Sequence, residues 1–185
     1  RPFAGLHRQA WFLLAAIVLL LTVNMMYQID IALFITKDLG ISAGFTGVLL
    51  GLTSALEIPI MLYFGARADR IGKWRLVVLA ALAAVLFFTL LPLATTKTML
   101  LVLQLANATF TAVILSVPVI ILQDTMPDRP GVASALYSSA FKAGGFLGGA
   151  ITGVVTAWLG FTHLFWACAL LALAATFLLF LGRRP

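Results

Sequence analysis

The sequence predicts an all-helical integral membrane protein whose chain crosses the bilayer six times. Of its 185 residues, 63% are hydrophobic and only 10% are charged, whereas about a quarter of the residues in soluble domains are charged. The mean hydropathy is +1.12. A spanning helix needs about 20 apolar residues, so six spans use about 120 residues and leave only short connections. These values exclude a water-soluble globular fold.

Three spans follow directly from runs without charge. Residues 9–29, 76–96 and 98–123 contain no Asp, Glu, Lys or Arg, and each run is long enough to cross a bilayer as a helix. After Asp30, further apolar residues continue the first span toward Lys37. The expected spans are 10–35, 76–95 and 99–122.

The other three spans need a break and two intramembrane charges. Residues 143–182 are free of charge but too long for one helix, and Gly160 supplies a break that gives a tight hairpin. The earlier arm of this hairpin must begin near Gly131 and include Lys142, and the remaining span includes Glu57. The expected spans are 45–66, 131–157 and 162–181.

The net charge of +6 reflects membrane topology. Nine Lys and Arg residues fall on one side of the expected spans, and the other side has only Lys37 and Lys97. By the positive-inside rule, both termini should be cytoplasmic. No basic stripe alternates with exposed aromatic residues, so no nucleic-acid partner is expected. The nine residues are Arg1, Arg8, Arg67, Arg70, Lys73, Arg75, Arg129, Arg183 and Arg184.

Glu57 and Lys142 should both lie near the middle of the bilayer, about 18 and 16 Å deep by helical rise. A charge at that depth costs at least about 2.5 to 3.5 kcal/mol, so each should face a partner or a cavity. One interpretation is a structural ion pair between the two spans. The other is electrostatic coupling in which Glu57 exchanges protons, with Asp30 as the reserve carboxylate.

Two polar stripes could share one layer. Asn24, Tyr27 and Asp30 lie at i, i+3 and i+6 within a 120° arc of the first helix, and Gln104 and Asn107 lie at i and i+3 of the fourth. Interhelical hydrogen bonding would explain each residue alone. Together they favour a wet pocket, in which Asn24, Tyr27, Gln104 and Asn107 contact a substrate.

Small residues indicate close helix packing. Gly47 and Gly51 are four residues apart on the second span, and Gly145, Gly149 and Gly153 repeat at the same spacing on the fifth. Such faces let helix backbones approach closely, either within the bundle or against another bundle.

Enzyme chemistry has no support in the sequence. There is no zinc-protease motif, phosphate-binding loop or serine triad pattern. The single Cys168 excludes a disulfide framework and a cysteine metal cluster. We expect neither metal nor cofactor.

The connection between the second and third spans resembles the signature loop of the major facilitator superfamily, Gly-x-x-x-Asp-Arg-x-Gly-Arg/Lys. The matching residues are Gly65, Asp69, Arg70, Gly72 and Lys73. The glycines permit tight turns, and Asp69 could cap the N-terminus of a neighbouring helix.

A narrower resemblance covers nearly the whole chain. Four segments resemble the C-terminal half of the bacterial sugar efflux transporters, whereas Asp30 and Lys142 depart from that family, where an amide and an arginine are expected. The segments are Asn24-x-x-Tyr27, residues 51–59 including Leu-Glu-Ile-Pro, residues 103–107, and residues 123–127 with Gln-Asp-x-Met-Pro.

This resemblance implies half of a twelve-helix transporter, built as two inverted three-helix repeats. The first and fourth helices would line a cavity, the second and fifth would contact a complementary half or a second copy, and the third and sixth would face lipid. It implies proton-coupled export of sugars or related polar metabolites across a bacterial inner membrane by alternating access. A multidrug-type efflux half and a non-transporting membrane scaffold remain open alternatives.

Overall fold

A computed structural model describes residues 8–183, which form six long helices and contain no strand. All six are long and apolar enough to span a membrane, so the predicted fold class is confirmed. A π-helical turn, Phe34–Asp38, extends α1, and a 3-10 turn, Leu91–Leu93, extends α3. The helices are α1 (Arg8–Leu33), α2 (Ala43–Ile71), α3 (Lys73–Leu90), α4 (Lys97–Thr125), α5 (Pro130–Leu159) and α6 (Phe161–Gly182).

Local sequence explains where the helices end. Gly72 (φ 95°) separates α2 from α3, and Gly160 (φ 84°) separates α5 from α6, because L-residues with side chains rarely adopt positive φ. The Thr96 hydroxyl accepts a hydrogen bond from the Met99 amide and caps α4. Helix α3 was expected to reach residue 95, but the helical segment ends at Leu93. Pro92 tightens its end into the 3-10 turn.

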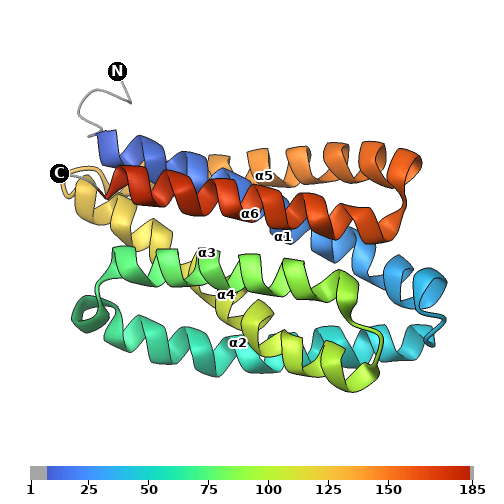
Figure 1. Ribbon diagram of the computed structural model, residues 1–185. Helices are drawn as coiled ribbons and strands as arrows, with labels where there is room; N and C mark the ends of the chain where they lie inside the picture. Colours follow the sequence, from blue (N-terminus) through green and yellow to red (C-terminus); the bar gives the residue numbers. More distant parts are fainter. Residues whose placement is uncertain (1–7, 184–185) are drawn as a thin grey trace.

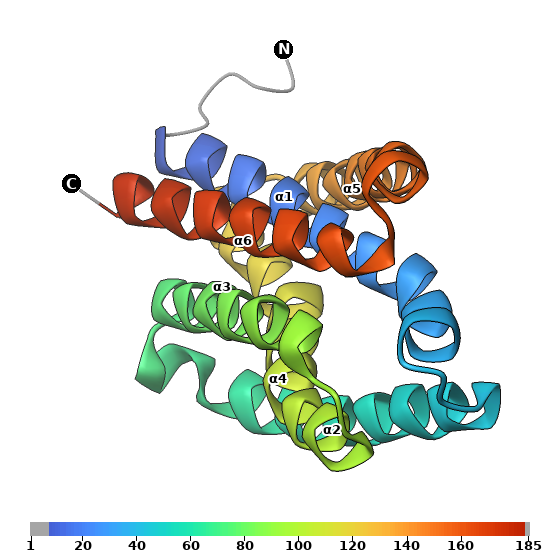
Figure 2. The same cartoon turned by 45° about the vertical axis from the view of Figure 1, so that its right-hand side comes forward.

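The helices pack in two groups of three, with α1, α5 and α6 in one group and α2, α3 and α4 in the other (Figures 1 and 2). Helix α1 packs mainly on α5 and α6, α4 packs mainly on α2 and α3, and α3 and α6 join the groups. If α1, α2 and α3 change places with α4, α5 and α6 in that order, the main helix contacts stay the same. Two three-helix repeats require this symmetry. Helices α1 and α4 are the most buried, and α2 and α5 the least.

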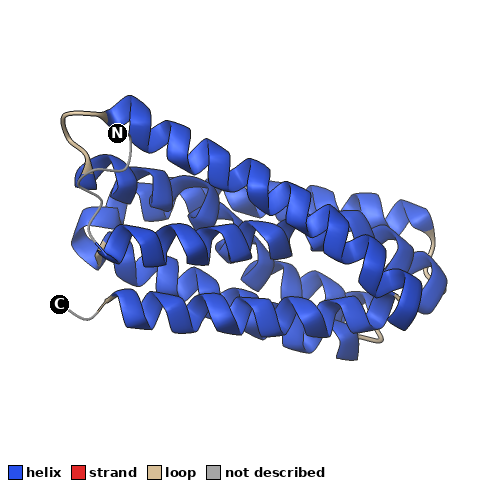
Figure 3. Cartoon of the chain, turned by 90° about the horizontal axis from the view of Figure 1, so that it is seen from above, coloured by secondary structure: helices blue, strands red, loops and turns tan. Residues whose placement is uncertain are grey.

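The long axes of the helices run in one general direction, and the start of α1 lies at the same end of the bundle as the end of α6 (Figure 3). The connection between α2 and α3 lies at this end as well (Figure 1). The bundle therefore gathers most of its basic residues at one end. Arg1 and Arg184, which also enter that count, lie outside the described residues.

The closest glycine packing inside this bundle is made by residues of α5 next to the four-residue pattern, and not by the pattern itself. A Cβ atom on Gly144 would lie 2.7 Å from the Leu21 Cβ, whereas a Cβ on Gly149 or Gly153 would have no neighbour within 4 Å. Gly47 and Gly51 on α2 are equally open. The open glycine faces lie on the two helices that this chain buries least.

The outer surfaces of α3 and α6 are apolar. Leu79, Leu82 and Leu86 of α3 and Leu170 and Phe177 of α6 are all exposed. Shallow grooves between α3 and α4 and between α3 and α6 are lined almost entirely by apolar side chains. Such a surface suits hydrocarbon and is incompatible with water.

Candidate functional site

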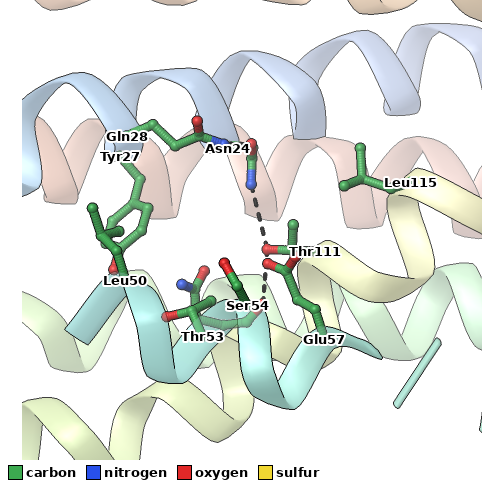
Figure 4. Close-up of a pocket in the computed structure, with 10 residues that line it drawn as sticks. Asn24, Tyr27, Gln28, Leu50, Thr53, Ser54, Glu57, Thr111 and Leu115 are labelled. Carbon is green, nitrogen blue, oxygen red and sulfur yellow. Dashed lines mark hydrogen bonds between the residues drawn. The ribbon is translucent and has the colours of Figure 1, made fainter. Parts of the chain in front are cut away.

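A polar cavity of about 310 Å³ opens between α1, α2 and α4. Its volume is within the range of small-molecule sites, which starts near 300 Å³. Figure 4 shows polar side chains from the three helices converging on it. The lining residues are Asn24, Tyr27, Gln28, Leu50, Thr53, Ser54, Glu57, Asn107, Thr111 and Leu115.

The α1 wall arises from helical spacing, because residues at i, i+3 and i+4 share a face. Asn24 Oδ1 accepts a hydrogen bond of 2.7 Å from Gln28 Nε2 on the same helix. Asn24 Nδ2 donates across the cavity to Thr111 Oγ1 of α4, at 3.4 Å (Figure 4). This pair ties α1 to α4 at the cavity.

Gln104 lies behind the wall, fully buried, and is not among the lining residues. Its Oε1 atom is 3.3 Å from Tyr27 Oη, 2.6 Å from Thr53 Oγ1 and 3.0 Å from Asn107 Nδ2. The three partners belong to α1, α2 and α4 and all line the cavity. Of the four predicted substrate residues, the structure therefore brings Asn24, Tyr27 and Asn107 to the cavity and places Gln104 beneath them.

Tyr27 is also held by aromatic packing. Its ring makes edge-to-face contacts with Phe87 and Phe88 of α3, at centroid distances of 5.3 and 6.1 Å. Such geometry adds to the stabilisation from burial alone. The Tyr27 hydroxyl is thus held at a fixed position in the wall.

Glu57 lines the cavity from α2, with Thr53 and Ser54 on the same helix (Figure 4). The expected ion pair with Lys142 is not formed: within residues 8–183, the ion pairs are those of Lys73 with Asp69 and Asp124. The reason is the packing of the helices, because α2 packs on α4 while α5, which carries Lys142, packs on α1. Lys142 is exposed on the open side of α5.

Asp30 does not continue the polar stripe into the cavity. It is 1% exposed, and neither carboxyl oxygen has a hydrogen-bond partner among the described residues. Helix α1 carries Asp30 into the packed interior of the bundle. Within the described part of the chain, no group of three or more His, Cys, Asp or Glu residues could hold a metal ion.

The signature loop forms an ion-pair cluster. Lys73 Nζ lies 2.8 Å from Asp69 Oδ1 and 2.7 Å from Asp124 Oδ2, so the start of α3 is linked to the ends of α2 and α4. Asp69 does not cap a helix: the N-cap position of α3 is Gly72, without a side-chain hydrogen bond. Arg70 and Gly65 are exposed.

Several lining residues were not predicted as site residues. Helical spacing could have found two of them, since Gln28 is four residues after Asn24 and Thr111 four after Asn107. The contribution of α2 beyond Glu57 had no comparable signal, because hydroxyl residues in apolar helices commonly bond their own backbone. The residues without prediction are Gln28, Leu50, Thr53, Ser54, Thr111 and Leu115.

Comparison with known proteins shows the family of this chain. The profile of the Major Facilitator Superfamily matches residues 12–185. The chain belongs to the major facilitator superfamily.

Relatives in this superfamily carry a more specific name. The chain is 36% identical over 166 residues to sugar efflux transporter A of Escherichia coli (strain K12), covering 90% of this chain and 42% of the relative. It is 33% identical over 159 residues to sugar efflux transporter C of the same organism, covering 85% and 40%. It is 31% identical over 173 residues to sugar efflux transporter B of Salmonella typhimurium, covering 94% and 44%.

These matches confirm the resemblance to bacterial sugar efflux transporters. They also show that the chain spans about two fifths of each relative's length. This superfamily consists of transporters, as expected from the lack of enzyme motifs. The protein is a multi-pass membrane protein with the six spans described above.

Proposed function

We propose that this chain is the C-terminal half of a proton-coupled exporter of sugars or related polar metabolites, working by alternating access in a bacterial inner membrane. The observation that carries the proposal is the cavity of about 310 Å³ between α1, α2 and α4, lined by amide, hydroxyl and carboxyl groups. Hydroxyl-rich ligands suit such a wall, because amides both donate and accept hydrogen bonds. The names of the relatives support the same substrate class.

A complementary six-helix half, or a second copy, completes the unit in this proposal. The cavity has walls from α1, α2 and α4 only, and alternating access needs an opposing half. The open glycine faces of α2 and α5 support their assignment to that contact, since Gly51 and Gly149 leave space for another backbone. The expected spans 10–35 to 162–181 would then correspond to the last six of twelve helices.

Proton coupling is assigned to Glu57, with Asp30 in reserve and Lys142 as a cation that acts when the halves close. Glu57 opens onto the cavity without a cationic partner in this bundle. Desolvation favours the neutral form of a carboxyl group, and a nearby ammonium favours the ionised form. Movement of α5 relative to α2 could therefore switch Glu57 between proton uptake and release.

The orientation proposed has both termini in the cytoplasm. The end of the bundle that holds Arg8 and Arg183 also holds the signature loop, and Lys37 and Lys97 lie at the opposite end. This asymmetry follows the positive-inside rule.

Transport by inverted membrane vesicles containing the full-length protein tests the proposal. An exporter that exchanges sugar for protons should accumulate a radiolabelled neutral glycoside, such as lactose, when the vesicle interior is acid. Accumulation should disappear when a protonophore collapses the gradient. If a range of neutral glycosides enters no faster than into vesicles lacking the protein, the proposal is wrong.

A further inference from the structure

Several side chains of the cavity wall point their hydrogen-bond donors away from the cavity, and we call this arrangement the hydrogen-bond polarity of the wall. The single Gln104 Oε1 atom sets it. Tyr27 Oη and Asn107 Nδ2 donate to this atom at 3.3 and 3.0 Å. Thr53 Oγ1 lies 2.6 Å from it and 2.9 Å from the Leu49 carbonyl oxygen. Because a hydroxyl has one proton, Thr53 directs that proton away from the cavity in either case.

The orientation of the Gln104 amide is determined by its own helix. Its Nε2 donates to the Leu100 carbonyl oxygen at 3.2 Å, so Oε1 must be the atom that faces the three donors. Asn107 must then present Nδ2 to Gln104, which leaves its Oδ1 as a buried acceptor without a partner among the residues that the structure describes.

Other groups in the wall follow the same polarity. The Thr111 hydroxyl donates to the Asn107 carbonyl oxygen at 2.9 Å, and Asn24 commits one amide hydrogen to Thr111. Glu57 adds carboxyl oxygens, and among residues 8–183 no Lys, Arg or His lines the cavity. Tyr27, Thr53 and Thr111 each donate their one hydroxyl proton to a protein oxygen, so toward a ligand these three hydroxyls act as acceptors.

We propose that this cavity recognises its ligand mainly by accepting hydrogen bonds from ligand hydroxyl groups, and that Gln104 is the positioning residue that sets this polarity. The inference rests on the proposed function, because it takes a hydroxyl-rich ligand as the occupant. It assigns Gln104 an indirect role: it orients Tyr27, Thr53 and Asn107 and does not touch the ligand.

Binding of glycoside analogues to the purified full-length protein tests this assignment. The probes are lactose and its monodeoxyfluoro derivatives, since fluorine approximately keeps the size of a hydroxyl group but cannot donate. At least one fluorine substitution should weaken binding to the wild type about tenfold, as expected when a buried hydrogen bond is lost. Equal affinity for lactose and every fluoro derivative would overturn the inference and leave the proposed function intact.

Variants of Gln104 separate positioning from a merely structural role. We call the Kd of a fluoro derivative divided by the Kd of lactose the fluorine penalty. Gln104→Met removes the shared acceptor and should bring this penalty close to one. Gln104→Glu keeps an oxygen acceptor and should preserve the penalty. Gln123→Met is the matched control on the same helix, because Gln123 bonds Ser134 away from the cavity. A structural role would weaken all ligands alike and leave the penalty unchanged, which would overturn the inference.

A second variant keeps the test decisive if Gln104→Met does not fold. Tyr27→Phe removes one acceptor from the wall and should reduce the penalty at a single ligand position, and an unchanged penalty at every position would count against the inference. Absence of lactose binding to the folded wild type, together with absence of glycoside transport, would overturn the proposed function and the inference with it.

Discussion

Gly148 of α5 lies directly against Met25 of α1. A Cβ atom on Gly148 would be 2.8 Å from the Met25 Cβ and 2.9 Å from the Thr22 carbonyl oxygen. Neither atom belongs to the flexible end of a side chain, so the two helices would have to separate. This contact fixes the distance between a cavity helix and one of the two helices that this chain leaves largely uncovered.

Gly148→Ala should therefore destabilise the bundle. Overpacking of a tight interface typically costs about 1–3 kcal/mol, and unfolding of the purified protein in detergent should occur at a correspondingly lower temperature. Gly131→Ala on the same helix is the matched control, because a Cβ there has no neighbour within 4 Å and alanine favours helix. Equal stability of the two variants would show that α5 does not pack on α1 as described.

Lys73 supports a second prediction. Its ammonium group joins Asp69 and Asp124 at the ends of α2 and α4, but both carboxylates are substantially exposed. Exposed ion pairs contribute little to stability. Lys73→Met should lower thermal stability slightly at low salt, and the difference should shrink as salt screens the pairs.

Arg70→Met provides the comparison for Lys73→Met, since Arg70 is exposed and forms no ion pair within residues 8–183. A salt-independent loss at Lys73, or an equal loss at Arg70, would contradict the role given to the cluster.

Tyr27→Phe removes one hydroxyl from the cavity wall and keeps the ring packed on Phe87. The affinity for a transported glycoside should fall about fivefold to tenfold, because a polar contact to the ligand is lost, and membrane insertion should be unchanged. Tyr63→Phe on α2 is the control, since Tyr63 is exposed and away from the cavity. Unaltered affinity in Tyr27→Phe would remove Tyr27 from the ligand site.

Glu57→Gln keeps the size of the side chain but cannot release a proton. We expect loss of sugar accumulation driven by a pH gradient, while exchange of labelled for unlabelled sugar continues. Both reactions can be followed in the same inverted vesicles. Full gradient-driven accumulation by Glu57→Gln would show that another group carries the proton.

The helical spans could be predicted from the sequence, and so could the polar residues that share a helix face, because both depend on local patterns. Runs without charge locate helices, and the three-residue spacing of Asn24 and Tyr27, and of Gln104 and Asn107, places each pair on one face. Which residue of a pair reaches the cavity depends on how helices rotate and pack. Gln104 is covered by Tyr27, Thr53 and Asn107, and nothing in its own helix indicates that.

The partner of a charged residue could not be predicted from its expected depth in the membrane. Glu57 and Lys142 were placed at similar depths by counting residues, yet depth does not determine which helices are neighbours. In this bundle α2 packs on α4, and α5 packs on α1. This arrangement keeps the Glu57 carboxylate and the Lys142 ammonium group from pairing. For Asp30, helical periodicity predicted which face of α1 carries the side chain. It did not predict which helix covers that face.

Protection of a cysteine at Ser54 from labelling tests most directly whether this cavity is the ligand site. Ser54 is exposed and lines the cavity, and the native Cys168 is buried. In the full-length protein, a transported glycoside should slow maleimide labelling of Ser54→Cys and should not affect Ser139→Cys, which is exposed on α5 outside the cavity. Equal labelling of Ser54→Cys with and without a saturating glycoside, in protein that still transports it, would contradict the account.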